Sequence, residues 1–169
     1  MSNERCTECG FAWDTPILDS FRIIEQLPRD LRGVIEAGGD AVHQRPAPDV
    51  WSPNEYLWHL ADLFRLSAEW MHDIRALDHP THYAIDTDAL TALRGYNRLP
   101  VETGLWSLEQ SCRLFIEEAA VTDPARICHY HDWQDVTAGQ VVGFLAHEAV
   151  HHLFDVQRAI GPKEASHAR

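Results

Sequence analysis

Apolar residues recur along the chain with the 3.6-residue period of amphipathic helices, and no stretch shows the alternation that marks strands. The first helical segment covers about residues 15–37, and its apolar stripe consists of Ile17, Phe21, Ile24, Leu27, Leu31, Val34 and Ile35. Pro28 is expected to kink or split this helix, because proline lacks a backbone donor and crowds the preceding turn. Gly38 and Gly39 end it, and residues 44–49 are expected to form an extended connection.

The second helix has the clearest start signal in the chain. Ser52 can cap it, Pro53 falls at its first position, and Glu55 completes a capping box with the serine. The helix is expected to last until about Leu77. Its predicted buried stripe consists of Leu57, Leu60, Phe64, Ser67 and Met71.

Two further long helices follow. One covers about residues 101–121 and stops before the Asp-Pro pair at 123–124. Its inward-facing residues are predicted to be Leu105, Leu108, Cys112, Phe115 and Ile116. The last helix runs from Thr137 to Ile160, with Gln140 as the partner in a second capping box and a Gly-Pro stop signal after it.

The connections complete the predicted architecture. Residues 78–100 are expected to form a long loop with a short helix near 89–93, and residues 126–135 a loop rich in histidine and aromatics. Four long helices joined in this way predict an all-α fold, an antiparallel-rich four-helix bundle with a long connection between helices two and three. The chain then divides into an N-terminal extension with a CxxC motif (1–14), the bundle (15–161) and a C-terminal tail (162–169).

Composition and charge narrow the classes of function. The chain has 169 residues, 45% of them hydrophobic and 24% charged, which suits one globular domain. Its formal net charge of -12 argues against binding to nucleic acids or anionic membranes, since both need clustered positive charge. No apolar run approaches the ~20 residues that cross a bilayer, and the first residues lack the apolar core of a signal peptide. We expect a cytoplasmic protein that binds a small-molecule substrate, with a homodimer as a plausible assembly.

Histidine is unusually frequent, and two of the 11 histidines suggest a metal site in the last helix. His147 and His151 are four residues apart, so one helix face can offer two imidazoles to one ion. Their stripe also carries Phe144, Phe154 and Arg158, and it is expected to face the bundle interior. Unpaired imidazoles would be unfavourable there. A pair of surface histidines is the alternative.

The same letters also match the H-E-x-x-H pattern of zinc proteases, in which the glutamate acts as a general base. Such proteases take their third ligand from downstream, but only 18 residues follow His151. The positions after His151 also lack the further histidine of the extended motif. A protease is therefore a minor alternative.

A third ligand is expected from the second helix. His59 lies beside the buried stripe there, although a lone histidine in this position would be interpreted as a core residue. Three imidazoles from two helices would leave positions open for water or substrate, as in catalytic sites. Asp62, one turn later, could orient His59 or be a solvated acid. Zinc, nickel or another divalent ion suits imidazole ligands.

These motifs resemble those of the DinB-like (YfiT-like) superfamily of metal-binding four-helix bundles, which includes mycothiol-dependent maleylpyruvate isomerase-like proteins. The resemblance rests on the pattern W-S-x-x-E-x-x-x-H-L-A-D over residues 51–62 and on the H-x-x-x-H pair of the last helix. The helical pattern supports it over about residues 15–161. It implies a three-histidine metal site at His59, His147 and His151.

The resemblance also implies a kind of activity. Members of this superfamily use low-molecular-weight thiols such as mycothiol or bacillithiol, as S-transferases or isomerases. A zinc or nickel ion would hold the thiol as a thiolate, which would attack a small electrophile in a pocket lined by aromatics such as Trp58 or Phe144. A non-catalytic metal- or ligand-binding protein with a stress or sensor role is the alternative. No catalytic residue beyond the ligands is predicted.

Cys6 and Cys9 form a CxxCG turn before the first helix. In a chain without an export signal, cysteines are expected to be thiols or metal ligands. The turn could supply half of a structural zinc site, with Cys128, His129 or His131 as the other half. A redox dithiol and free thiols are the alternatives.

The remaining histidines are less informative. His152 is rotated by about 100° from His151, so it is not expected to join the same ion. The histidines in or near loops are expected to be solvated: His43, His72, His79 and His82.

Overall fold

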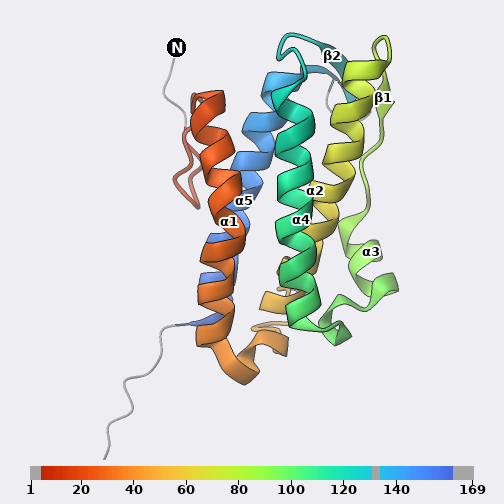
Figure 1. Ribbon diagram of the computed structural model, residues 1–169. Helices are drawn as coiled ribbons and strands as arrows, with labels where there is room; N and C mark the ends of the chain where they lie inside the picture. The colour runs from red at the N-terminus through yellow and green to blue at the C-terminus, as the bar shows by residue number, and fades with distance from the viewer. Residues whose placement is uncertain (1–4, 131–133, 162–169) are drawn as a thin grey trace, which may run out of the picture.

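Four long helices build the part of the chain that the computed structural model describes, residues 5–130 and 134–161 (Figure 1). They are α1 (Ile17–Gly38), α2 (Pro53–Ala76), α4 (Val101–Ala120) and α5 (Ala138–Ile160). The short segments η1 (Gly39–His43), α3 (Thr87–Arg94) and η2 (Tyr96–Arg98) lie in the connections. The predicted four-helix bundle is confirmed, including the short helix within the long connection.

Both predicted capping boxes are formed. Oγ of Ser52 accepts a hydrogen bond from the backbone N–H of Glu55, whose carboxylate accepts one from the N–H of Ser52. Thr137 and Gln140 make the same reciprocal pair at the start of α5. Each pair satisfies backbone donors that the first helical turn would otherwise leave unpaired. The local sequence therefore determines where both helices begin.

Helix α1 passes through Pro28 without a break, so the predicted split was wrong. Ile24, Leu27 and Leu31, on either side of the proline, are 0–2% exposed. Burial of one such side chain is worth about 1.5–3 kcal/mol. This is comparable to the roughly 3 kcal/mol penalty of a proline inside a helix. Packing on both sides of Pro28 therefore keeps the helix continuous.

The directions of the helices differ from the antiparallel-rich arrangement that the sequence predicts. α2 packs mainly on α4, and α1 packs mainly on α5. Within each of these two pairs the helices run in the same direction (Figure 1). The connection between α2 and α4, residues 77–100, makes this possible because it returns along the bundle before α4 begins.

The core consists of the predicted apolar stripes. Every member of the α2 stripe is fully buried, and the α4 stripe is buried except for the partly exposed Ile116. Ile17, at the start of α1, is 37% exposed and lies at the edge of the core. The buried apolar residues of α5 are Ala138, Val142, Leu145, Ala146, Ala149 and Val156.

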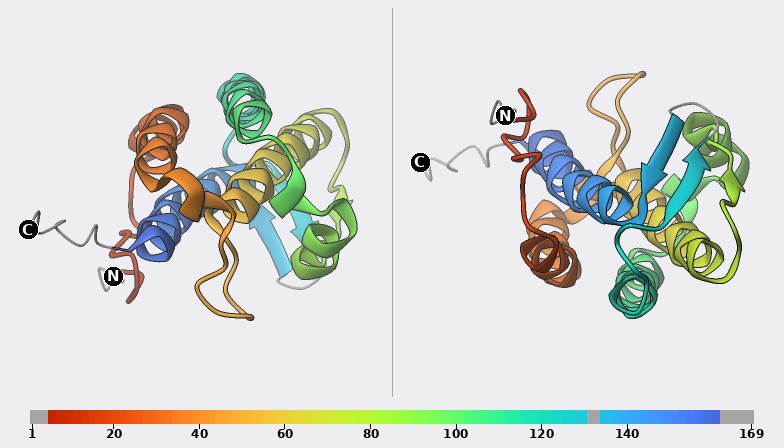
Figure 2. Two further views of the ribbon diagram at one scale, coloured as in Figure 1. Left: turned by 90° about the horizontal axis from the view of Figure 1, so that it is seen from below. Right: turned by 90° about the horizontal axis from the view of Figure 1, so that it is seen from above.

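A small sheet lies at the end of the bundle where α2 and α4 finish and α5 begins (Figures 1 and 2). Strand β2 (Ile127–Tyr130) pairs antiparallel with β3 (Gln134–Thr137) and parallel with β1 (Thr81–His82). The prediction of a loop over residues 126–135 was therefore wrong. Strands of two to four residues are too short for an alternating pattern to be visible in the sequence.

His82 also differs from its prediction. It lies in β1, is only 6% exposed, and its ring centroid is 5.3 Å from that of Trp70. It is therefore not a solvated loop residue. The ring contact with Trp70 places it beside the C-terminal part of α2.

Residues 5–16, which we call the N-terminal segment, lie against α5 (Figure 2). Phe11 is 6% exposed, and its ring centroid is 5.7 Å from that of His147. The segment thus covers a face of α5 that the other helices leave open. Residues 1–4 and the predicted tail, residues 162–169, lie outside the described residues. Among the described helices, none combines the length and apolar character needed to cross a membrane.

Candidate functional site

Helix α5 carries ligand-type side chains on two adjacent faces. Successive residues of an α-helix are rotated by about 100°, so residues four apart share a face. His147 and His151 share one face, and Glu148 and His152 share the next. All four side chains are partly buried. The structure supplies a different set of partners to each face.

On one face, Glu148 and His152 meet His59 of α2. The donor atoms of these three residues, which we call the interhelix cluster, all lie within 4.8 Å of one another. Nε2 of His152 is 3.2 Å from Oε2 of Glu148. The rings of His59 and His152 are nearly perpendicular, with centroids 5.0 Å apart. Two imidazoles and one carboxylate thus converge between α2 and α5.

Burial and neighbouring charges set the protonation of this cluster. Burial and the charge of His152 lower the pKa of His59 to about 4, so its imidazole is neutral near pH 7. Burial disfavours the charge on His152, but hydrogen bonds to Asp155 and Glu148 outweigh it and raise its pKa to about 9. Burial also opposes the charge on Glu148, yet its contacts with His147 and His152 hold its pKa well below the usual range.

Two aromatic rings flank the interhelix cluster. The ring centroid of Trp51 lies 5.0 Å from that of His59, and the ring of Tyr56 lies 5.3 Å from that of His152. Nε1 of Trp51 donates a 3.0 Å hydrogen bond to Asp88 in α3. The indole is therefore held against the cluster, where His59 is only 7% exposed.

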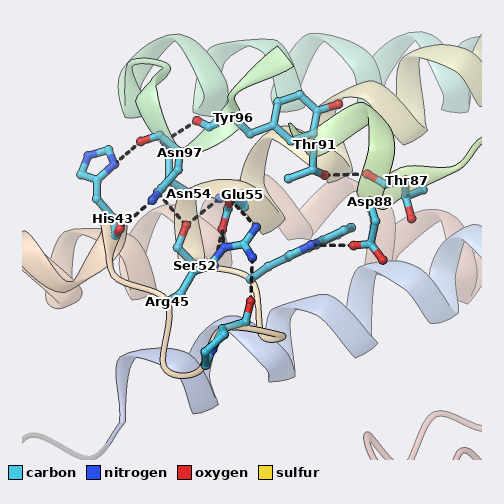
Figure 3. A network of polar contacts seen from close by, with 12 residues as sticks. His43, Arg45, Ser52, Asn54, Glu55, Thr87, Asp88, Thr91, Tyr96 and Asn97 are labelled. Carbon is cyan, nitrogen blue, oxygen red and sulfur yellow. Dashed lines mark hydrogen bonds and ion pairs between the residues drawn. The ribbon is translucent and has the colours of Figure 1, made fainter. Parts of the chain in front are cut away.

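A network of polar contacts fixes the segment that carries Trp51 (Figure 3). Arg45 donates two hydrogen bonds of 2.8 Å to the carboxylate of Glu55. On the other side, the Asn54 amide donates to the backbone carbonyls of Tyr96 and Leu99. The start of α2 is thereby tied both to the loop before it and to the connection that leads to α4.

Asp62, one turn after His59, is also part of this framework. It is 7% exposed and accepts hydrogen bonds from Oη of Tyr96 and from the guanidinium of Arg94. It is therefore not a solvated acid. Its carboxylate ties the middle of α2 to the long connection.

On the other face of α5, His147 and His151 meet the cysteines of the N-terminal segment. The donor atoms of Cys6, Cys9, His147 and His151, which we call the N-terminal cluster, all lie within 4.8 Å of one another. Sγ of Cys6 is 3.7 Å from Nδ1 of His151. A hydrogen bond from the backbone of Cys9 and the nearby imidazole of His147 lower the pKa of Cys6 to about 6, whereas burial raises the pKa of Cys9.

The structure divides the three predicted ligand histidines between the two clusters. His147 and His151 lie together, as their spacing predicts, but they contact the N-terminal segment and do not face the bundle interior. His59 lies instead with Glu148 and His152, which sequence reasoning did not select as ligands. Glu148 and His152 are also four residues apart, so the same helical spacing argument could have predicted them as a second pair of ligands.

The residues suggested as partners of the CxxC turn have other surroundings. Cys128 is 1% exposed in β2, and burial raises its pKa. Nδ1 of His129 is 2.9 Å from Oδ1 of Asp135 on the neighbouring strand. His131 lies outside the described residues. The C-x2-C spacing of Cys6 and Cys9 and the H-x3-H spacing of His147 and His151 are together typical of Cys2His2 zinc sites. This combination could have predicted the partners that the structure shows.

A cavity of about 790 Å³ lies at the start of α5, a size typical of small-molecule pockets. Its largest lining side chains are Trp13, Trp70, Tyr130 and Phe144. Phe144 precedes Glu148 by one helical turn, about 6 Å along the axis. Of the two aromatics predicted to line a pocket, Phe144 does so. Trp58 is buried instead, with the guanidinium of Arg94 6.0 Å from its ring.

The fold and these clusters define a class of protein: a four-helix bundle with parallel neighbouring helices and metal-ligand side chains between its second and last long helices. The chain belongs to the DinB superfamily, whose family model matches residues 23–154.

Comparison with solved structures adds a structural relative. No curated protein sequence matches the chain. Among solved structures, it is similar to YfiT from Bacillus subtilis, with a TM-score of 0.77, 18% sequence identity and coverage of 85% of each chain. That protein is described as a probable metal-dependent hydrolase with an unusual four-helix bundle topology. At this identity, the likeness shows a shared fold.

Proposed function

We propose that this DinB superfamily member is a divalent-metal-dependent enzyme whose ion is bound by His59, Glu148 and His152. It acts on a small electrophile, as an S-transferase or isomerase, with a low-molecular-weight thiol such as mycothiol or bacillithiol as cosubstrate. Zinc or nickel is the ion we expect. The observation that carries the proposal is the convergence of three donors from two helices within 4.8 Å.

The donor set suits a divalent first-row ion. Imidazole nitrogen and carboxylate oxygen are both common zinc ligands, and nickel also accepts imidazole. Nδ1 of His152 is 3.0 Å from Oδ2 of Asp155, so a carboxylate orients this ring, as is usual for metal-binding histidines. Three protein donors leave room for an external ligand, whereas a closed structural site uses four.

The chemistry follows from this open position. A bound ion lowers the pKa of a thiol and supplies it as a thiolate. Trp51 and Tyr56 flank the cluster and restrict water there, and the apolar cavity lined by Phe144, one helical turn before Glu148, suits an electrophile. Because such thiols are kept reduced in the cytoplasm, the proposal includes a cytoplasmic location.

Two other functions would use the same donors. Water in the open position would make the site hydrolytic, which is the activity suggested for YfiT. Binding of an ion or ligand without turnover would suit a stress or sensor role. Dependence on an added thiol separates the proposal from both.

The test measures thiol binding in cobalt(II)-loaded, full-length protein, because thiolate-bound cobalt(II) absorbs in the near ultraviolet. The double variant Cys6→Ser/Cys9→Ser is used so that the cysteines of the N-terminal segment do not contribute. Adding mycothiol or bacillithiol is expected to produce the thiolate band, and His59→Ala in the same background is expected to abolish it. Conjugation of the thiol to a bimane electrophile should fall at least tenfold in parallel.

His72→Ala is the matched control, because His72 also lies on α2 but its side chain is 56% exposed. It should keep both the band and the conjugation. Ester hydrolysis that needs His59 but no thiol would replace the proposal with a hydrolase. Metal binding at the cluster with neither reaction would identify a binding protein.

A further inference from the structure

We infer that the N-terminal cluster binds a zinc ion of its own, which fastens residues 5–16 to α5. Its donors are two thiols and two imidazoles, a complete set for a closed tetrahedral site. The cluster shares no ligand with the interhelix cluster. The inference therefore does not depend on the proposed function.

The donor atoms already lie close to a zinc-binding arrangement. All four are within 4.8 Å of one another, and Sγ of Cys6 is 3.7 Å from Nδ1 of His151. With metal–ligand bonds of about 2.0–2.3 Å, tetrahedral ligands are roughly 3.3–3.8 Å apart. Nε2 of His147 is buried and has no hydrogen-bond partner among the described residues. A buried unpaired nitrogen of this kind requires an explanation, and an ion supplies one.

The outer ring nitrogens face carboxylates, as those of metal-binding histidines usually do. Nδ1 of His147 is 3.2 Å from Oε1 of Glu148, which leaves Nε2 for the ion. Nε2 of His151 is 3.6 Å from carboxylate oxygens of both Asp155 and Glu8, which leaves Nδ1 beside Cys6. Both rings are thus oriented from outside the cluster.

The backbone of the N-terminal segment presents both cysteines to α5. The N–H of Cys6 donates to the carbonyl of Phe11 at 2.8 Å, and the N–H of Gly10 donates to the carbonyl of Cys6 at 2.9 Å. Gly10 has a φ of 76°, a conformation that glycine adopts without strain. Phe11 anchors the turn by its burial. The turn is therefore formed by its own hydrogen bonds and supports the cysteine pair.

Zinc explains the cluster better than a redox dithiol does. A dithiol that cycles with a disulfide needs only Cys6 and Cys9, and it would leave the two histidines without a role. Thiolate and imidazole together favour zinc, and the C-x2-C and H-x3-H spacings are those of Cys2His2 sites. On binding, each thiol releases its proton to solvent, and no electron is transferred.

The ion would also fix one wall of the cavity. Trp13 lies four residues after Cys9, and its ring centroid is 4.5 Å from that of His147. The same indole lines the 790 Å³ cavity. Zinc therefore holds this wall in place, and removing it should release the wall together with the N-terminal segment.

The first experiment is elemental analysis of full-length, untagged His59→Ala protein, in which the interhelix cluster has lost a ligand. After zinc loading and desalting, about one zinc per chain is expected. Adding either Cys6→Ser or His151→Ala should remove it. Cys128→Ala and His129→Ala, at the alternative positions, should each keep it. Circular dichroism checks that every variant remains helical.

The second experiment uses the wild type, so it does not depend on the folding of variants. Zinc should protect two thiols from a disulfide reagent, and a chelator should expose them. Hydrogen exchange in residues 5–16 should rise at least tenfold with the chelator, and exchange in α4 should stay unchanged.

Three results would overturn the inference: no zinc in His59→Ala, zinc that persists when Cys6→Ser and Cys9→Ser are added to His59→Ala, or equal thiol reactivity with and without chelator in the wild type. If variants of the N-terminal cluster lose this zinc but still conjugate the thiol normally, the proposed function stands. If His59→Ala loses conjugation but still binds one zinc, the zinc site of the N-terminal cluster stands.

Discussion

The carboxylate of Glu148 lies 3.2 Å from Nδ1 of His147, its neighbour in the chain. The other oxygen of the same carboxylate lies 3.2 Å from Nε2 of His152. One side chain therefore contacts a member of each cluster. If both clusters hold ions, a single carboxylate is a ligand of one ion and orients a ligand of the other.

Glu148→Gln is therefore expected to weaken zinc binding at both clusters. The amide keeps the shape of the side chain but carries no charge, so it is a poor ligand and a weaker acceptor for His147. Loss of such an outer carboxylate typically reduces metal affinity about 10–100-fold. Competition with a chelator measures both affinities. Glu117→Gln on α4, where the side chain is 57% exposed, is the control and should bind as the wild type does. Unchanged affinity in Glu148→Gln would contradict the bridging role.

Glu55 should make stability depend on pH. Burial disfavours its charge, but hydrogen bonds from Arg45 and from the N–H of Ser52 outweigh this and lower its pKa below the ordinary value of 4.5. A group with a lowered folded-state pKa stabilises the fold above its unfolded pKa, and this contribution is lost as pH falls through the folded value.

The wild type should therefore exceed Glu55→Gln in free energy of unfolding by about 1–2 kcal/mol near pH 7. The difference should shrink as pH falls below about 4.5. Urea unfolding at several pH values measures this difference. Titration of the metal ligands affects both proteins equally, so it cancels from the difference. A difference that stays constant down to about pH 3 would show that the charge of Glu55 is not what stabilises the start of α2.

Gly104 is expected to be required for the close packing of α4 on α2. A Cβ there would lie 2.8 Å from Cδ2 of Leu57 and 3.0 Å from Nε1 of Trp58. Leu57 is fully buried and has little space to move. Overpacking costs about 1–3 kcal/mol, which exceeds the ~1 kcal/mol that alanine adds in helix propensity.

Gly104→Ala should therefore lower the free energy of unfolding by up to about 2 kcal/mol. Gly33→Ala in α1 is the matched control, because its Cβ would meet nothing within 4 Å. That variant should be more stable than the wild type by about 0.5–1 kcal/mol. Thermal unfolding of the two variants side by side is the measurement, and the same sign for both would refute the packing argument.

Asn54 should be important for holding the connection between α2 and α4 in place. Its buried amide donates at 3.0 and 2.9 Å to the carbonyls of Tyr96 and Leu99, which lie just before α4. Asn54→Ala removes both donors and is expected to cost about 2–3 kcal/mol. Gln26→Ala on α1, whose exposed amide bonds to Asp30 and Arg29, should cost less. Urea unfolding compares them, and equal losses would argue against a special role for Asn54.

The helices and their start points could be predicted from the sequence because they depend on local physics. The Ser52 and Thr137 capping boxes are formed by residues three apart, and the apolar stripes follow the helical period. The short strands could not be predicted in this way. β1 and β2 are paired across more than forty residues, and neither is long enough to show a period.

The parallel direction of α2 and α4 also depended on tertiary structure. The sequence predicts that residues 78–100 form a long connection, but a loop of that length can lead to either end of a bundle. Bonds such as those from Asn54 to the connection, together with Asp62 to Arg94 and Tyr96, hold it along α2. They join residues that are distant in sequence, so no local pattern encodes them.

The sequence by itself determined that α5 carries side chains of the metal-ligand type and that a cysteine pair precedes α1. Only the tertiary structure decided how these residues combine. His147 and Glu148 are adjacent in sequence but point about 100° apart, and each face of a helix meets a different partner. The packing of α2 and of the N-terminal segment on α5 places His59 with Glu148 and His152, and Cys6 with His151. Helical periodicity fixes which residues share a face, whereas long-range packing decides what that face contacts.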